Sequence, residues 1–157
     1  MAILEVGSKA PELDIVNQNG ETKSLADYKG KWLVLYFYPK DNTPGCTTEA
    51  KDFSSMIEEF KKNNAEVVGV SPDTVKKHCN FIEKQNLTVE LLADPEQKVL
   101  ESYGVWQLKK NYGKEYMGVV RTTYVIDTEG NIARVWEKVK VKGHVLEVLE
   151  YVQSSVK

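Results

Sequence analysis

The feature that most constrains this chain is an unbroken apolar run over residues 32–38 (WLVLYFY), which has the length of one β-strand. A strand with apolar side chains on both faces must be covered on both sides, as in the middle of a sheet. A second such run covers 65–70, and between the two, over 47–63, apolar residues recur at helical spacing. This order predicts parallel strands joined by a right-handed crossover.

Further elements are predicted on both sides of this unit. Residues 13–16 and 21–24 flank Asn19-Gly20, a pair that supplies the positive φ angles of a tight turn, so we expect an N-terminal β-hairpin. After the second strand, Ser71-Pro72-Asp73 is predicted to open a helix with Asp73 as its N-cap.

The C-terminal part predicts a hairpin and a closing helix. Residues 122–126 and 131–136 flank the turn at 127–130, and apolar residues at helical spacing follow from Val145 to Val152. A β–α–β unit followed by a β-hairpin and a helix is the order of elements in a thioredoxin-like fold. We therefore expect a single α/β domain over residues 1–157, with a central mixed β-sheet flanked by helices and an N-terminal β-hairpin.

Composition excludes several classes of function. The net charge of −2 and the pI near 5.8 provide no basic field for nucleic acid or an anionic membrane. The start of the sequence shows no basic stretch followed by a long apolar one, and no apolar run approaches the roughly 20 residues that span a bilayer. We therefore expect a cytoplasmic protein, in which two cysteines are either inert core residues or part of the chemistry.

The segment 39–49 (PKDNTPGCTTE) is the most informative part of the sequence for function. A buried strand ends, a loop with two prolines and a glycine follows, and a helix is predicted to begin at Cys46. The unpaired N–H groups and the positive dipole end of a helix N-terminus favour a thiolate over a thiol, and the thiolate is the nucleophile. The alternative is a small buried cysteine, which is a common core residue.

Other cysteine chemistries fit the sequence poorly. A dithiol oxidoreductase needs a second cysteine three residues after the first, and that position is Glu49. Cys46, Cys79, His78 and His144 do not have the spacing of zinc ligands, so no metal site is predicted.

The motif Pro39-x-x-x-Thr43-x-x-Cys46 resembles the active-site motif of peroxiredoxins. Its local form, YPKDNTPGCT followed by EAKDF, is similar to the bacterioferritin comigratory protein (peroxiredoxin Q) group. The resemblance extends over nearly the whole chain and includes Val6-Gly7, Ala10-Pro11, residues 69–73, residues 91–95 and residues 121–126.

The resemblance implies a peroxidase with named roles for its residues. Cys46 would be the thiolate that attacks the peroxide and becomes a sulfenic acid. Thr43 would orient the thiolate and the peroxide, and Arg121 would stabilise the thiolate and the departing oxygen. Pro39 would shield the sulfur from water.

Two further roles are implied at the start of the helix. The backbone N–H groups of Gly45 and Cys46 would bind peroxide oxygens. Glu49 would hold the Arg121 guanidinium, although an acidic residue in a first helical turn is also favourable for the helix dipole alone. The resemblance implies a hydroperoxide substrate, electrons from thioredoxin or a similar dithiol carrier, and a monomer. It implies no metal, haem or flavin.

Recycling of the sulfenic acid leaves two alternatives open. In many members of the group a resolving cysteine lies five residues after the first, but that position is Lys51, which excludes a disulfide within the helix. Some relatives carry this cysteine on the following helix, where Cys79 lies. Cys79 either resolves the sulfenic acid or fills a core stripe with Val75 and Ile82, in which case an external thiol completes a one-cysteine cycle. We assign no role to His78, because adjacent helical residues point apart.

Two rival functions remain on this fold. One is a thiol–disulfide oxidoreductase, which the missing second cysteine disfavours. The other is a binding or chaperone module without catalysis, which the intact set of Pro39, Thr43, Cys46 and Arg121 disfavours.

Overall fold

The computed structural model describes residues 3–155. The strands are β1 (Ile15–Asn17), β2 (Thr22–Lys23), β3 (Trp32–Phe37), β4 (Ala65–Ser71), β5 (Glu90–Ala93), β6 (Trp106–Asn111), β7 (Lys114–Val119), β8 (Thr122–Ile126) and β9 (Ile132–Trp136). The helices are the 3₁₀ turn η1 (Leu25–Tyr28) and the α-helices α1 (Pro44–Ser55), α2 (Ile57–Lys62), α3 (Val75–Gln85), α4 (Lys98–Ser102) and α5 (His144–Ser155).

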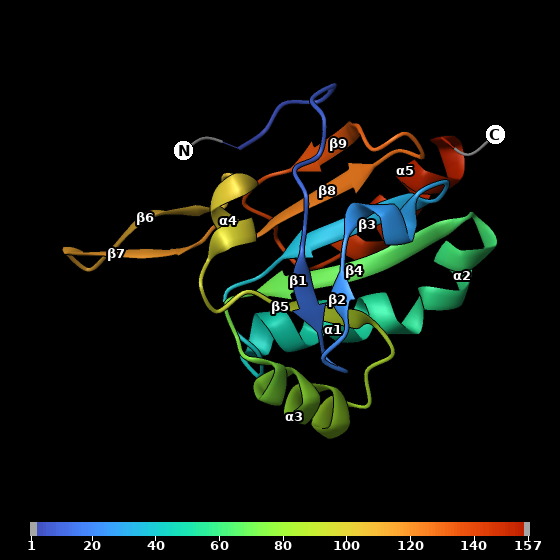
Figure 1. Ribbon diagram of the computed structural model, residues 1–157. Coiled ribbons are helices and arrows are strands. Elements are labelled where there is room, and N and C mark those ends of the chain that lie inside the picture. The colour runs from blue at the N-terminus through green and yellow to red at the C-terminus, as the bar shows by residue number, and fades with distance from the viewer. Residues whose placement is uncertain (1–2, 156–157) are drawn as a thin grey trace.

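The predicted mixed sheet is present, in the order β2-β1-β5-β4-β3-β8-β9. Strands β3, β4 and β5 are parallel, whereas β1, β2, β8 and β9 pair antiparallel with their neighbours. The apolar run of β3 lies near the centre of this sheet (Figure 1). Its position explains why both of its faces are apolar.

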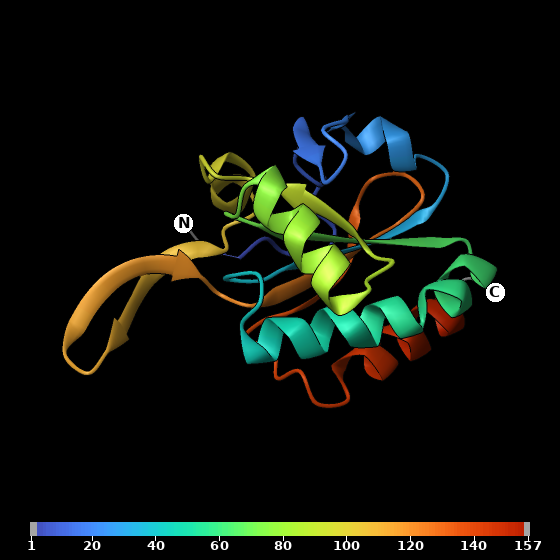
Figure 2. The same ribbon diagram turned by 90° about the horizontal axis from the view of Figure 1, so that it is seen from below.

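The two faces of the sheet carry separate cores. Val34 and Tyr36 belong to the core that contains buried residues of α1, α2 and α5, and these helices lie together along one face (Figure 2). Leu33 and Leu35 point the opposite way, into a core that contains residues of η1 and α4. This alternation follows from the two-residue period of a strand.

The two-stranded hairpin β6–β7 was not predicted from the sequence. It extends away from the body of the protein (Figure 1), and its strands pair only with each other in the described part of the chain. Tyr112 and Gly113 at its tip both have positive φ angles, 52° and 78°, as a tight turn between twisted strands requires. No helix within residues 3–155 is both long and apolar enough to cross a bilayer.

The N-terminal hairpin β1–β2, the hairpin β8–β9 and the helix α5 confirm three of the predicted elements, although in the turn of the first hairpin Gly20 has the positive φ, 77°, and Asn19 does not. The helix predicted over 47–63 is wrong in detail, because α1 begins at Pro44 and the chain breaks at Met56 before α2. Phe53 and Phe60 are both buried on the two sides of this break, so the apolar stripe continues although the backbone does not.

The prediction that Asp73 caps the next helix is also wrong. Thr74 is the N-cap of α3, and its Oγ1 accepts a hydrogen bond from the Lys77 N–H at 3.3 Å. The Asp73 carboxylate instead accepts from the Asp41 N–H at 2.8 Å and the Ser71 hydroxyl at 2.7 Å. A long-range partner in the neighbouring loop thus replaces the local capping interaction.

Candidate active site

The loop after β3 carries the cysteine motif to the start of α1. Thr43 is the N-cap, Pro44 is the first helical residue, and the first helical hydrogen bond runs from the Thr47 N–H to the Thr43 carbonyl at 2.8 Å. Cys46 therefore lies in the first turn, where the N–H groups of Gly45 and Cys46 precede the helical ladder. Its side chain is 1% exposed and belongs to the core that contains the buried residues of α1, α2 and α5.

Arg121 reaches this turn because of the register of two antiparallel strands. Phe37 at the end of β3 pairs with Thr122 at the start of β8, so the residue before Thr122 lies beside the loop that follows β3. Arg121 Nη2 donates to Cys46 Sγ at 3.2 Å. The two residues are 75 positions apart in sequence, and only the sheet brings them together.

The second guanidinium nitrogen binds the carboxylate of Glu49. Arg121 Nη1 donates to Glu49 Oε1 at 2.6 Å, and the Glu49 side chain is fully buried. One planar cation thus connects the sulfur to an acidic residue one turn further along α1.

The environment shifts the ionisation of both members of this pair. Burial raises the pKa of Glu49 to about 7, an effect that the neighbouring Arg121 charge and hydrogen bond only partly offset. Burial alone would lower the pKa of Arg121, but the charges of Glu49 and Cys46 outweigh it, and that pKa is raised. Three side-chain polar atoms among residues 3–155 are buried without a hydrogen-bond partner: Glu49 Oε2, the Tyr36 hydroxyl and Trp136 Nε1.

Thr43, Gly45 and Pro39 lie on the chain just before Cys46. The Thr43 hydroxyl donates to the Lys40 carbonyl at 2.7 Å, which leaves its lone pairs to accept a proton donor. A Cβ atom on Gly45 would lie 3.3 Å from Arg121 Nη2, so the glycine leaves room for the guanidinium. Pro39 is half-buried in the same loop, and its shielding role stays a prediction.

Cys79 does not belong to this cluster. It is exposed on α3, and its Sγ donates to the Gln18 carbonyl at 3.0 Å, in the turn of the N-terminal hairpin. The interpretation of Cys79 as a core residue is therefore wrong. The buried residues of α3 are His78 and Phe81, so His78 and Cys79 do point apart.

A profile of the AhpC/TSA family matches residues 6–135, which is most of the chain. The chain belongs to the AhpC/TSA family. Peroxiredoxin Bcp of Bacillus subtilis is 56% identical over 147 residues, 94% of each protein. A putative peroxiredoxin bcp of Helicobacter pylori strain J99 is 49% identical over 150 residues, 96% of this chain and 99% of that protein. These relatives confirm the resemblance to the bacterioferritin comigratory protein group.

Solved structures of peroxiredoxin Q proteins confirm the thioredoxin-like fold. Peroxiredoxin Q of Xanthomonas campestris is similar with a TM-score of 0.89 and 39% identity, covering 99% of both chains. A mutant of Xylella fastidiosa PrxQ is similar with a TM-score of 0.94 and 35% identity, covering both chains completely. With this membership, the chain is a thiol-dependent peroxidase.

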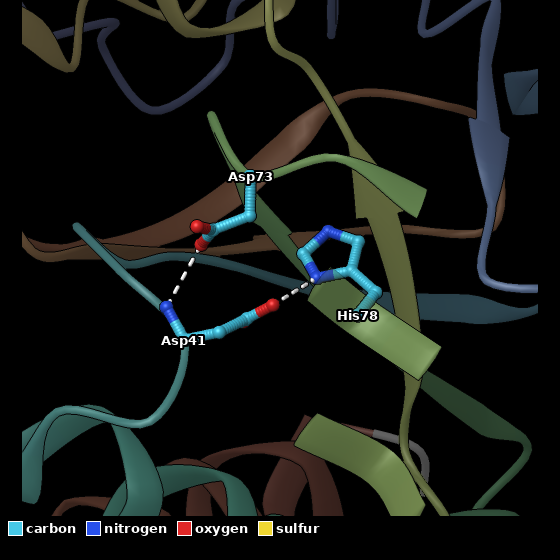
Figure 3. A group of neighbouring side chains, drawn as sticks. All are labelled: Asp41, Asp73 and His78. Atoms are coloured by element: carbon cyan, nitrogen blue, oxygen red, sulfur yellow. Dashed lines mark hydrogen bonds and ion pairs between the residues drawn. The ribbon is translucent and has the colours of Figure 1, made fainter. Parts of the chain in front are cut away.

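The residues that hold hydrogen bonds to the loop before Cys46 in this AhpC/TSA protein were not predicted from the sequence. Within the described part of the chain, Asp41, Asp73 and His78 have ligand atoms within 4.8 Å of one another, a spacing that could hold a metal ion (Figure 3). Both His78 nitrogens and both Asp41 carboxylate oxygens, however, already have protein partners in hydrogen bonds. The sequence shows only that His78 lies in the first turn of a predicted helix. It does not indicate that the partner of His78 is Asp41, 37 residues earlier.

Proposed function

We propose that the chain reduces hydroperoxides through the Cys46 thiolate, with Arg121 as the group that stabilises it. The observation that supports this assignment is the contact of Arg121 Nη2 with Cys46 Sγ at 3.2 Å, inside a site where Glu49 fixes the other guanidinium nitrogen. A partly buried, preoriented cation acts on developing charge more strongly than a fully exposed one, because less water screens it.

The proposed reaction is a displacement at oxygen. The Cys46 sulfur attacks one peroxide oxygen, an S–O bond forms, and the O–O bond breaks. The electron pair leaves on the second oxygen, which takes up a proton and departs as alcohol or water, and Cys46 becomes a sulfenic acid. Arg121 stabilises the charge on the departing oxygen.

The remaining residues of the turn orient the peroxide in this proposal. The Thr43 hydroxyl accepts a hydrogen bond from the peroxide O–H, because its own proton is directed to the Lys40 carbonyl. The N–H groups of Gly45 and Cys46 donate to peroxide oxygens. Pro39 keeps bulk water from the sulfur.

The proposed substrates are hydrogen peroxide and organic hydroperoxides. A structural study of the Xanthomonas campestris bacterioferritin comigratory protein concerns its alkyl peroxide reduction activity, and that protein is 38% identical to this chain with complete coverage of both. We propose the same substrate class here. We also propose that the protein is a monomer in the cytoplasm, where reducing systems convert the oxidised cysteine back to the thiol.

Cys79 is the proposed resolving thiol. Its thiolate attacks the sulfenic sulfur, an S–S bond forms, the S–O bond breaks, and the leaving hydroxide takes up a proton and departs as water; thioredoxin or a similar dithiol then reduces the disulfide. Cys46 is buried and Cys79 is directed at Gln18, so the first turn of α1 must unwind before the sulfurs meet. This same orientation of Cys79 favours the second candidate, a one-cysteine cycle in which an external thiol attacks the sulfenic acid directly.

One set of variants separates these functions. Peroxide-dependent NADPH oxidation with thioredoxin and thioredoxin reductase is measured for wild type, Cys46→Ser and Cys79→Ser. We expect no turnover for Cys46→Ser, and for Cys79→Ser one round of sulfenic acid formation without thioredoxin-driven turnover. Peptide mapping after one equivalent of peroxide should show a Cys46–Cys79 linkage in wild type.

Other outcomes identify the alternatives. Unchanged turnover in Cys79→Ser with no linkage in wild type would establish the one-cysteine cycle. Reduction of disulfides without peroxide would identify a thiol–disulfide oxidoreductase, and absence of any reaction would indicate a binding module.

A further inference from the structure

Three buried side chains join the loop that precedes Cys46 to the neighbouring helix (Figure 3). Asp41 lies in that loop, and its carboxylate Oδ2 is 2.7 Å from His78 Nδ1 on α3. The Asp41 N–H donates to Asp73 Oδ2 at 2.8 Å, and Asp73 follows β4. His78 is 0% exposed, and Asp41 and Asp73 are each 5% exposed, so these bonds are shielded from water.

The hydrogen bonds of His78 determine how many protons the pair holds. His78 Nε2 is 2.9 Å from the Leu92 carbonyl, which can only accept, so Nε2 carries a proton. Nδ1 faces the Asp41 carboxylate, whose other oxygen accepts from the Tyr38 hydroxyl at 2.6 Å. One further proton therefore lies between Nδ1 and Oδ2, and the contact is a buried, charge-assisted hydrogen bond.

The position of Asp41 gives this bond a consequence for the reactive cysteine. Asn42 follows with a φ of +63°, where the chain turns sharply into the N-cap Thr43 and the first turn of α1. The loop is thus attached through Tyr38 to the end of β3, through Asp73 to the end of β4, and through His78 to α3. The direction in which the chain enters α1 depends on these attachments.

We propose that His78, acting through Asp41, is a positioning residue for the peroxide reaction. The pair holds the loop over residues 39–43 so that Thr43 and the first turn of α1 present Cys46 to Arg121 and to the peroxide. Neither His78 nor Asp41 contacts the reacting atoms. The proposal rests on Cys46 being the peroxide-reactive thiol, as proposed above, and therefore wild-type reactivity is measured beside every variant.

Two substitutions of His78 test which of its hydrogen bonds matters. The side-chain nitrogen of asparagine occupies nearly the place of Nδ1, so His78→Asn keeps a donor to Asp41 and loses the bond to Leu92. The nitrogen of glutamine corresponds to Nε2, so His78→Gln keeps the bond to Leu92 and loses the link to Asp41. Both variants leave one buried acceptor unpaired, so both destabilise the fold.

The measured quantity is the second-order rate constant for Cys46 sulfenic acid formation with hydrogen peroxide. Displacement of a reactive group by about 1 Å can cost on the order of a hundredfold in rate, and we expect His78→Gln to be about tenfold to a hundredfold slower. His78→Asn should restore most of that loss. Amide hydrogen exchange of residues 40–48 should accelerate in His78→Gln relative to the amides of β3 and β4.

A control separates positioning from general stability. Val152→Ala truncates a fully buried side chain of α5 that the hydrogen-bond network does not include, and it should lower stability without slowing the reaction. Asp41→Ala removes the acceptor that faces His78 Nδ1 and provides a second test if a His78 variant does not fold, and it should slow the reaction as His78→Gln does.

Three results would overturn the proposal. They are equal rates in His78→Gln and wild type, equal slowing in His78→Gln and His78→Asn, or an Asp41→Ala rate equal to that of wild type. Absence of reaction in wild type itself would instead reject the role of Cys46 on which the proposal rests.

Discussion

Replacement of Arg121 by lysine tests the central contact of the site without removing its charge. The guanidinium uses one nitrogen for Cys46 Sγ at 3.2 Å and the other for Glu49 Oε1 at 2.6 Å. A lysine ammonium is a single point charge on a flexible stem and does not have the planar fork that spans two partners. The substitution therefore separates the effect of a positive charge near Cys46 from the effect of a guanidinium held in place by Glu49.

The expected cost follows from the number of hydrogen bonds lost. One charged hydrogen bond contributes about 1.5–3 kcal/mol. At roughly 1.4 kcal/mol for each factor of ten in rate, its loss slows the reaction about 10- to 150-fold. Complete removal of a preoriented donor from a transition state slows a reaction roughly 100- to 1,000-fold. We expect a smaller effect here, because lysine keeps the positive charge.

The assay is rapid-quench trapping of the Cys46 sulfenic acid with hydrogen peroxide over a series of pH values. Arg134→Lys is the matched control, because it makes the same change at the other arginine of the sequence, which is exposed on β9 and lies over the Trp136 ring. It should leave the rate unchanged. A loss below threefold in Arg121→Lys would refute the reasoning. Full recovery of its rate at high pH would limit Arg121 to an effect on thiol ionisation.

Three further substitutions probe the surroundings of this contact. Burial raises the pKa of Glu49 from its ordinary 4.5 to about 7, so the folded chain retains a proton that the unfolded chain releases, and stability falls by roughly 3 kcal/mol as pH rises from 4.5 to 7. Urea unfolding of Glu49→Gln should lack this slope, and a pH-independent difference from wild type would contradict it. Gly69→Ala would place a Cβ atom 2.7 Å from the Tyr36 ring, and we expect a loss of about 1–3 kcal/mol in urea unfolding; unchanged stability would show that the ring can move. Gly45→Ala displaces the Arg121 guanidinium by a few tenths of an ångström and should slow the peroxide reaction about tenfold with little change in stability; an unchanged rate would mean that the contact tolerates this shift.

The parts of the fold that were predicted from the sequence have a strong local signal. The strand β3 is apolar on both faces, and the turn at Asn19-Gly20 has a residue pair typical of hairpins. The hairpin β6–β7 was missed because Tyr112 adopts the positive φ that is usually left to glycine or asparagine. The break at Met56 was missed because the buried stripe passes over it without interruption.

The parts of the site that escaped prediction depend on contacts between distant segments. Cys46 was predicted from its place at a strand–helix junction, whereas the place of Arg121 followed only from the family resemblance. On α3, the apolar spacing placed Cys79 on the buried face with Val75 and Ile82, but Ile82 packs against the core beside His78 and Phe81, whereas Cys79 is exposed. A polar residue, His78, occupies the buried position because Asp41 and the Leu92 carbonyl satisfy its two nitrogens. Hydropathy alone does not reveal such a pairing.

The register that pairs Phe37 with Thr122 also sets when, during synthesis of the chain, the contact between Arg121 and Cys46 can form. A ribosome completes the turn with Cys46 long before it adds Arg121, and until β8 docks against β3 the sulfur has no cation beside it. A nascent or truncated chain that ends before β8 therefore lacks the contact between Arg121 and Cys46. With the role proposed for Arg121, such a chain should form the Cys46 sulfenic acid more slowly than the complete protein.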